Sequence, residues 1–171
     1  MIYKVVKYGA PVLEQVGEPV DNFGTPELDK LIDDMFETMY AHKGVGLAAP
    51  QIGLSKRLTV IDTSAGEDPE QKLVLINPSI LSLDGSQVGE EGCLSIPGFR
   101  EDVKRAMKAT VRAQRPGGDW FEHSGEELLA RAMQHEIDHL NGILFLQHLS
   151  GLKRDLIRRK IRKLQKAGEW D

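Results

Sequence analysis

Short β-type runs follow one another from residue 58 to residue 121 with no helical pattern between them, and this limits the folds open to the chain. The runs are apolar or β-branched and bounded by turn residues: Leu58 to Asp62, Leu73 to Asn77, Ile80 to Leu83 and Ala109 to Gln114. Residues 116–119, Pro-Gly-Gly-Asp, then predict a turn toward Trp120 and Phe121. Parallel strands need long crossover connections, usually helices. We therefore expect an α+β fold with antiparallel strands.

The region before these strands contains a helical pattern. Thr25 is a typical N-cap, Pro26 suits the first helical position, and an acid follows in the first turn. Apolar side chains recur at helical spacing up to Tyr40, and Gly44 predicts the end of the helix. Residues 44–53 hold too much Gly and Pro for a regular element and too many apolar residues for a solvated loop. We expect a packed, shaped loop there.

Two further helical patterns follow the strands. The first is expected to begin at Ser124, whose spacing to Glu127 fits a capping box, and to end at Asn141-Gly142. The second spans about residues 151–166 and is mostly basic. Its apolar stripe consists of Leu152, Leu156, Ile157, Ile161 and Leu164.

The length and composition predict one domain. A chain of 171 residues has the size of a single ordinary domain, so we expect residues 1–171 to form one domain that includes the basic helix. No apolar run reaches the roughly 18 residues of a membrane span. The first residues lack an apolar signal core and an Arg/Ser-rich transit stretch. These features favour a cytoplasmic protein without a membrane partner.

Charge is distributed unevenly along the chain. Residues 151–171 carry 8 basic and 3 acidic side chains, which leaves 14 basic and 23 acidic side chains before them. The C-terminal segment is therefore strongly positive on a negative body. This asymmetry indicates a segment with its own partner rather than a uniformly basic DNA-binding protein.

The clearest chemical motif is His135-Glu136-Ile137-Asp138-His139. Two imidazoles four residues apart project from one face of a helix, close enough to bind one ion, and Glu136 is turned aside toward a water on that ion. The alternative is a chance pattern on a polar helix face. The flanking apolar residues Met133 and Leu140 favour the metal site.

A catalytic metal of this kind usually needs a third protein ligand. The extended zinc-protease pattern would place a His six residues after His139, but that residue is Phe145. Of the later acids only Asp155 and Glu169 are candidates, and both are unusual. Cys93 is favoured instead, because its thiolate is a good soft ligand, although a lone cysteine is more often a buried structural thiol. We assign no catalytic role to His42, His123 and His148.

Three segments in this order resemble the signature motifs of bacterial peptide deformylases. They are Gly44 to Gly53, Glu91-Gly-Cys-Leu-Ser95 and Gln134-His-Glu-Ile-Asp-His139, and the similarity covers nearly the whole chain. The resemblance implies small antiparallel sheets around a central helix that carries the two His, followed by a C-terminal helix. It implies removal of the formyl group from N-formylmethionyl nascent peptides.

The resemblance also assigns roles to residues. Cys93, His135 and His139 match the metal ligands, and Glu136 matches the catalytic base, which takes a proton from water and hands it to the departing amine. The Gln51 amide and the Leu94 backbone N–H match the donors to the oxyanion. The family generally works with Fe²⁺, for which Zn²⁺, Ni²⁺ or Co²⁺ can substitute.

Further positions match the family's substrate pocket. Those at the methionine pocket are Val45, Gly46, Gly92 and Leu94, for which simple packing is the alternative. Glu91 and Arg100 match a pair near the substrate entrance, where an ion pair that only orders the loop is the alternative. Arg131 stands where many members carry an apolar residue, so we expect a more polar pocket wall or entrance.

Two other functions remain open on the sequence alone. A general zinc endopeptidase shares the helical motif but would cleave internal amide bonds. A noncatalytic, metal-stabilised module that docks on ribosomal RNA would leave Glu136 and Gln51 without a role. Ribosome docking by the basic helix is also a hypothesis for an enzyme, and a solvated basic face is its alternative.

Overall fold

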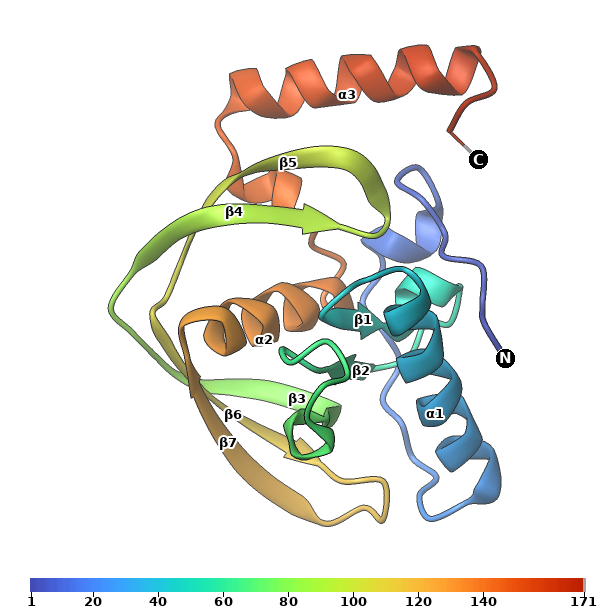
Figure 1. Ribbon diagram of the computed structural model, residues 1–171, viewed down its shortest axis with the longest axis vertical. Coiled ribbons are helices and arrows are strands. Elements are labelled where there is room, and N and C mark those ends of the chain that lie inside the picture. The colour runs from blue at the N-terminus through green and yellow to red at the C-terminus, as the bar shows by residue number, and fades with distance from the viewer. Residues whose placement is uncertain (171) are drawn as a thin grey trace.

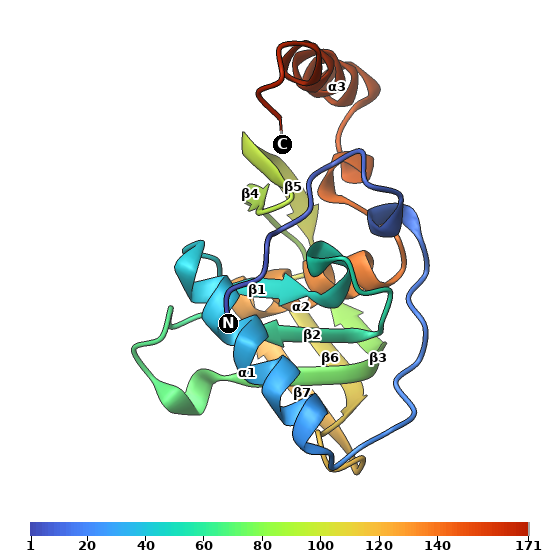
Figure 2. The same ribbon diagram turned by 90° about the vertical axis from the view of Figure 1, so that its right-hand side faces the viewer.

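The computed structural model describes residues 1–170, which form three α-helices and seven strands (Figures 1 and 2). The helices are α1 (Pro26–Ala41), α2 (Glu127–Leu140) and α3 (Gly151–Lys166). The strands are β1 (Gly46–Ala48), β2 (Leu58–Ile61), β3 (Leu73–Asp84), β4 (Gln87–Cys93), β5 (Ile96–Arg105), β6 (Lys108–Gln114) and β7 (Trp120–Glu126). Short 3-10 helices occur at Pro11–Glu14, Ala49–Ile52, Pro69–Gln71 and Phe145–His148.

The strands form two separate antiparallel sheets. The larger sheet has the order β1-β2-β3-β6-β7, and β4 and β5 form a hairpin of their own. Helix α2 lies between the two sheets, and α3 lies beyond the hairpin at one end of the molecule (Figure 1). The predicted α+β arrangement around a central helix is thus confirmed. None of the helices in residues 1–170 is long and apolar enough to cross a membrane.

Helix α1 begins as the sequence predicts. The Thr25 side chain accepts a hydrogen bond from the Leu28 N–H at 3.1 Å, and Pro26 is the first helical residue. The buried face of α1, which includes Met35 and Met39, packs against β1 and β2. The end of the helix differs from the prediction, because the left-handed residue is Lys43, with φ of 57°, and not Gly44.

The segment 44–53 is more regular than its composition suggested. Residues 46–48 form β1, which pairs with β2, and residues 49–52 form a 3-10 helix that ends at Gly53 in the left-handed region. Pro50 fits because the first helical positions need no backbone donor. The expected packing is present, since residues 47–52 are all buried.

Two features of the strands were not apparent from the sequence. The runs at 73–77 and 80–83 are one strand, β3, whose pairing with β6 shifts register between Ile76 and Ser79. Asn77 has a φ of 50°, which accounts for the break in the apolar pattern. The β4–β5 hairpin had not been predicted, because its residues are largely charged or Gly.

The predicted start of α2 is wrong. Ser124 lies in β7, and its hydroxyl is 2.7 Å from that of Thr110 on β6. The helix starts at Glu127 with no side-chain cap. The local Ser-to-Glu spacing is overridden by cross-strand pairing along the whole of β7.

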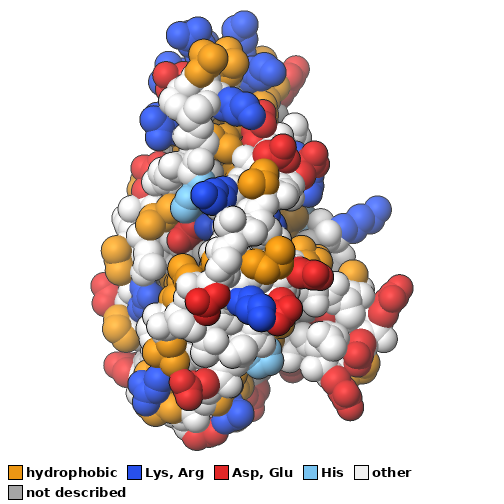
Figure 3. Space-filling model, turned by 90° about the vertical axis from the view of Figure 1, so that its left-hand side faces the viewer, with side chains coloured by type: hydrophobic (Ala, Val, Ile, Leu, Met, Phe, Trp, Pro, Cys, Tyr) orange, Lys and Arg blue, Asp and Glu red, His pale blue; other side chains and the backbone are white. Residues whose placement is uncertain are grey.

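Helix α3 packs on a second part of the core, which we call the terminal core. Ile157 and Ile161 are buried there with Phe145, Leu13 and Trp170. Leu152 and Leu156, predicted in the same stripe, are 73% and 45% exposed. Figure 3 shows Lys and Arg side chains gathered at the end of the molecule that α3 forms.

Candidate active site

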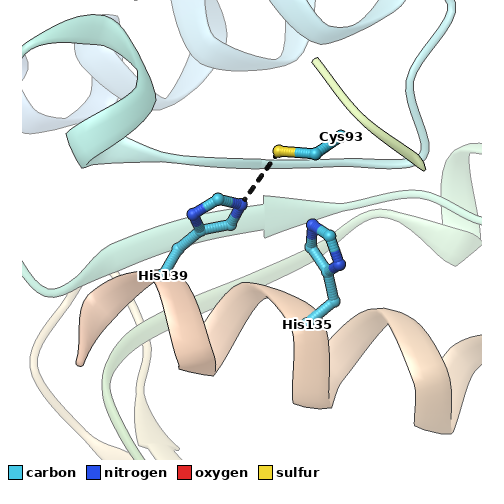
Figure 4. Close-up of side chains that lie close together, drawn as sticks. All are labelled: Cys93, His135 and His139. Atoms are coloured by element: carbon cyan, nitrogen blue, oxygen red, sulfur yellow. Dashed lines mark hydrogen bonds between the residues drawn. The ribbon is translucent and has the colours of Figure 1, made fainter. Parts of the chain in front are cut away.

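Three side chains that can bind a metal meet above α2. His135 and His139 lie one turn apart on α2, and Cys93 lies at the end of β4, where a register shift in the hairpin follows Gly92. One ligand atom from each residue lies within 4.8 Å of the others. Figure 4 shows the three side chains pointing toward one another, with Cys93 Sγ 3.4 Å from His139 Nε2.

The donor set fits a divalent metal ion. Bonds of about 2.3 Å to sulfur and about 2.1 Å to nitrogen in a tetrahedral site place two such ligands about 3.6 Å apart. The observed 3.4 Å between Cys93 and His139 is close to this. Burial lowers the pKa of His139 well below its ordinary value, so its imidazole is neutral, as metal binding requires.

Glu91 fixes the ring of His135. His135 Nδ1 is 2.7 Å from Glu91 Oε1, which leaves Nε2 for the metal site. Burial lowers the pKa of His135, but hydrogen bonds with Cys93 and Glu91 outweigh this and raise it well above its ordinary value. Cys93 and Glu91 therefore surround this imidazole with groups that favour a positive charge, which a bound metal ion would supply in place of a proton.

A buried charge network holds Glu91 in turn. Arg105 donates to both of its carboxylate oxygens, at 2.8 and 2.9 Å, and Arg131 Nη1 donates to Oε2 at 2.6 Å. Although burial raises the pKa of Glu91, the hydrogen bonds from Arg105 and His135 hold it well below its ordinary value. Arg105 also donates to Asp138 at 2.7 Å, and His148 Nε2 is 2.8 Å from the same carboxylate.

An ion pair between Glu91 and Arg100, which was the alternative to a role at the substrate entrance, is not formed. Arg100 Nε donates to Glu90 at 2.6 Å, on the exposed side of the hairpin. Neighbouring residues on a strand face opposite sides, so Glu91 points inward and Glu90 outward. Arg105 and Asp138 were missed from the sequence. The one available signal is that Arg105 falls two residues after the buried Val103 and so on the same face of β5.

Glu136 is buried beside the candidate metal ligands. Burial raises its pKa to about 7, which suits a group that must both accept and donate a proton. Among residues 1–170 its Oε1 has no hydrogen-bond partner, although the atom is buried. A Cβ on Gly46 would lie only 2.5 Å from Oε2, so only Gly leaves room for this carboxylate.

The Gln51 amide has a fixed orientation. Its Oε1 accepts a hydrogen bond from the Ala48 N–H at 2.9 Å, which directs Nε2 toward Ser95 Oγ at 3.2 Å and Cys93 Sγ at 3.5 Å. The 3-10 helix at 49–52 creates this geometry. A donor is thereby aimed at the place where the candidate metal ligands converge.

A cavity of about 700 Å³ opens onto these groups. Its lining includes all of the predicted site residues except His139: Val45, Gly46, Gln51, Glu91, Gly92, Cys93, Leu94, Arg100, Arg131, His135 and Glu136. Arg131 is buried, and a Cβ on Gly89 would lie 3.1 Å from its Nη2. A second cavity, of about 500 Å³ beside α1, contains none of these residues.

Comparison with known sequences gives the same family throughout. The profile of the family described as polypeptide deformylase matches residues 2–155. A peptide deformylase of Acidobacterium capsulatum is 63% identical over 170 residues, which are 99% of each chain. One of Alkalilimnicola ehrlichii is 49% identical over 168 residues, covering 98% of this chain and 93% of the relative.

Solved structures agree with these sequences. The crystal structure of a peptide deformylase from Legionella pneumophila superposes with a TM-score of 0.90 at 47% identity, covering 100% of this chain and 99% of that one. The peptide deformylase from Thermus thermophilus gives a TM-score of 0.86 at 42% identity, with coverage of 95% of this chain and 94% of that one.

Proposed function

This chain belongs to the polypeptide deformylase family, and from that premise we propose how its residues carry out the reaction. It is a metal-dependent hydrolase that removes the N-terminal formyl group from formyl-methionine of newly synthesised polypeptides and releases formate. The observation that supports our assignment of roles is the buried, unpartnered carboxylate oxygen of Glu136 beside a convergent Cys-His-His set.

In this proposal Cys93, His135 and His139 hold the metal. When bound, a divalent ion polarises the formyl carbonyl and lowers the pKa of a water molecule at the site. We propose Fe²⁺ from the family resemblance, with Zn²⁺, Ni²⁺ or Co²⁺ as substitutes. Metal analysis of protein purified without oxygen, with activity measured after reconstitution with each ion, tests this choice.

Glu136 moves the proton. Its carboxylate takes a proton from the attacking water and later gives it to the α-amine that leaves as formate is released. A pKa of about 7 makes both transfers accessible near neutral pH. Gly46 supports this role by allowing the carboxylate to lie close to β1.

Gln51 and Leu94 stabilise the oxyanion that forms on the formyl oxygen. The Gln51 Nε2 is oriented before substrate binds, because Oε1 is held by the Ala48 N–H, and such preorganised donors are effective in a site shielded from water. The backbone N–H of Leu94 is the second donor. Gln51→Leu removes one donor and should cost on the order of a hundredfold in rate.

The cavity of about 700 Å³ receives the methionine side chain. Val45, Gly46, Gly92 and Leu94 form its wall near the metal ligands. Arg131 contributes a more polar stretch of wall, although its charge is paired with Glu91. Glu91 supports the site through His135, and Arg100 lies at the entrance.

The decisive experiment is formate release from a formyl-Met peptide by anaerobically purified protein, beside Glu136→Ala and Gln51→Leu, with metal content measured on all three. We expect release by the parent and near-complete loss in Glu136→Ala that still holds its metal. Near-normal turnover by Gln51→Leu would remove Gln51 from the mechanism. Cleavage of internal amides without formate release would favour the peptidase alternative.

We also propose that α3 holds the enzyme near the ribosome, in the cytoplasm, as part of one catalytic domain of residues 1–171. The support is eight Lys and Arg side chains in α3 and the exposed Leu152 and Leu156. Deletion of α3 is a poor test because Ile157 and Ile161 are buried. Pelleting with ribosomes should instead weaken when the exposed Arg159, Arg162 and Lys163 are changed to Glu.

A further inference from the structure

The rim of the active-site cavity carries more positive than negative charge. Two cations, Lys43 and Arg100, line it together with Glu90 and His42, while Glu91 and Glu136 lie deeper and are buried. His42 and Lys43 follow the end of α1, and Glu90 and Arg100 come from the β4–β5 hairpin. When the first side chain of a peptide occupies the cavity, the rest of the peptide must extend out of the cavity past these residues.

Within the part of the chain that the structure describes, only one of these rim charges is free. Arg100 is paired with Glu90 at 2.6 Å, so the two charges largely cancel. His42 Nδ1 lies 2.9 Å from the Thr38 carbonyl oxygen at the end of α1. Lys43 is exposed, and among residues 1–170 it forms no ion pair and no side-chain hydrogen bond.

The backbone at Lys43 is unusual as well. Its φ of 57° lies in the left-handed region, at the position just past a helix where Gly is preferred. The Lys43 N–H donates to the Tyr40 carbonyl and the Gly44 N–H to the Met39 carbonyl, so the turn is fixed. A Lys is therefore held at the rim in a conformation that its Cβ disfavours, and such strain often accompanies function.

We propose that Lys43 makes this enzyme prefer formylated peptides that carry a carboxylate in the residues directly after formyl-methionine. The proposal rests on the proposed function and adds a substrate preference to it. A four-carbon stem lets the ammonium group reach across the rim, where the one exposed carboxylate among the described lining residues, Glu90, is already paired. The attraction is weak, because both charges are solvated, and it is screened by salt.

A structural role for the Lys43 charge is the main alternative. A cation past a helix C-terminus is favoured by the helix dipole, and this effect alone would explain why a Lys occupies position 43. Lys43→Gly separates the two roles, because Gly suits a φ of 57°. If Lys43 acts on substrate, Lys43→Gly loses the preference while its stability is kept or raised.

The test compares two amidated peptides, formyl-Met-Ala-Asp and formyl-Met-Ala-Lys, by kcat/KM at low ionic strength. The parent should favour the acidic peptide by about threefold, which corresponds to a weak solvent-exposed charge pair. Lys43→Gly should have the same kcat/KM for both peptides, and Lys43→Glu should have the higher kcat/KM for the Lys peptide. About 1 M salt should abolish the difference, since the screening length is then about 3 Å.

Lys166→Glu is the matched control, since Lys166 is exposed on α3 and absent from the cavity lining. It changes net charge as Lys43→Glu does, so it should keep the parental preference. Equal ratios in the parent and in Lys43→Glu, with formate still released, would overturn the proposal but not the proposed function. Failure of the parent to release formate from either peptide would overturn both.

Discussion

The two faces of α2 are buried to a similar degree but have different roles. The face toward the larger sheet carries Ala130, Met133 and Ile137, which pack with apolar residues of β2, β3 and β6. The face toward the β4–β5 hairpin carries His135 and His139, and Glu136 lies at the side of this face, close to Gly46 of β1. The first face stabilises the fold by removing apolar surface from water. The second buries charge and polar atoms, which costs stability unless each is paired.

This difference shows how one helix can contribute both to the core and to the candidate active site. The apolar face fixes where α2 lies, and its hydrogen-bonded backbone then sets the spacing of the chemical groups on the opposite face. Both Glu91 carboxylate oxygens are paired, but among residues 1–170 three buried atoms of α2 have no hydrogen-bond partner: Glu136 Oε1, His139 Nδ1 and Arg131 Nη2. In the proposed mechanism the Glu136 carboxylate is the group that moves the proton.

The largest effect is expected at the Glu136 carboxylate. Glu136→Gln should lower kcat by about a hundredfold to ten-thousandfold, because the amide cannot accept the proton. Thermal stability of the metal-free variant should stay equal or rise, since no carboxylate has to be buried. Melting temperature and formate release should be measured on the same preparation. Loss of stability in parallel with activity would mean that Glu136 belongs to the structural face.

On the apolar face of α2, a comparable free-energy effect is expected on stability and not on activity. Met133→Ala should cost about 2–5 kcal/mol of unfolding free energy, because Met133 is fully buried against the larger sheet. Urea unfolding measures this loss. Leu128→Ala is the control, and its unfolding free energy should change little because Leu128 is 48% exposed. The folded fraction of Met133→Ala should keep a kcat close to that of the parent. A large fall in kcat would show that the two faces are coupled.

A smaller effect is expected where pairing is thorough. Glu91→Gln should weaken metal affinity by about tenfold to a hundredfold, because His135 loses the carboxylate that orients its ring. Competition with a chelator measures this affinity. Glu90→Gln, one residue away and exposed, is the matched control and should leave metal affinity unchanged. Equal affinities in the two variants would contradict a role for Glu91 beyond packing.

The smallest effect is expected at the start of α2, which belongs to neither face. Ser124→Ala should cost less than about 0.5 kcal/mol, because Ser124 lies in β7 and caps no helix. Thr25→Ala, which removes the N-cap of α1, should cost about 1 kcal/mol in the same assay. A similar loss of unfolding free energy in both variants would instead support the helix start that was predicted from the sequence.

The sequence predicted the elements whose signals are local. The spacing of His135 and His139 on a helix needs only the helical repeat, and Thr25 and Pro26 mark the start of α1 by their own chemistry. The β4–β5 hairpin was missed because its outward residues are charged and its inward positions include Gly89 and Glu91 instead of apolar side chains. Nothing local distinguishes such a strand from a loop.

The supporting charges of the site could not be predicted for a related reason. Glu91 meets Arg105 from the neighbouring strand and Arg131 from α2, 14 and 40 residues away along the chain. The family resemblance paired Glu91 with Arg100, but strand alternation turns Arg100 outward to Glu90. Which carboxylate faces inward depends on a register that the structure sets.

The terminal core joins the first and last segments of this sequence. Trp170 Nε1 donates to the Tyr8 carbonyl oxygen at 2.8 Å, and Leu13 packs with Ile157 and Ile161. A ribosome makes the first of these segments long before the last. The apolar surface of Leu13 therefore stays exposed until residues 157–170 have left the exit tunnel. During synthesis this surface is therefore a natural place for a chaperone to bind. The hairpin that carries Cys93 packs on the same core, so the candidate metal site should be completed only late in synthesis of the chain.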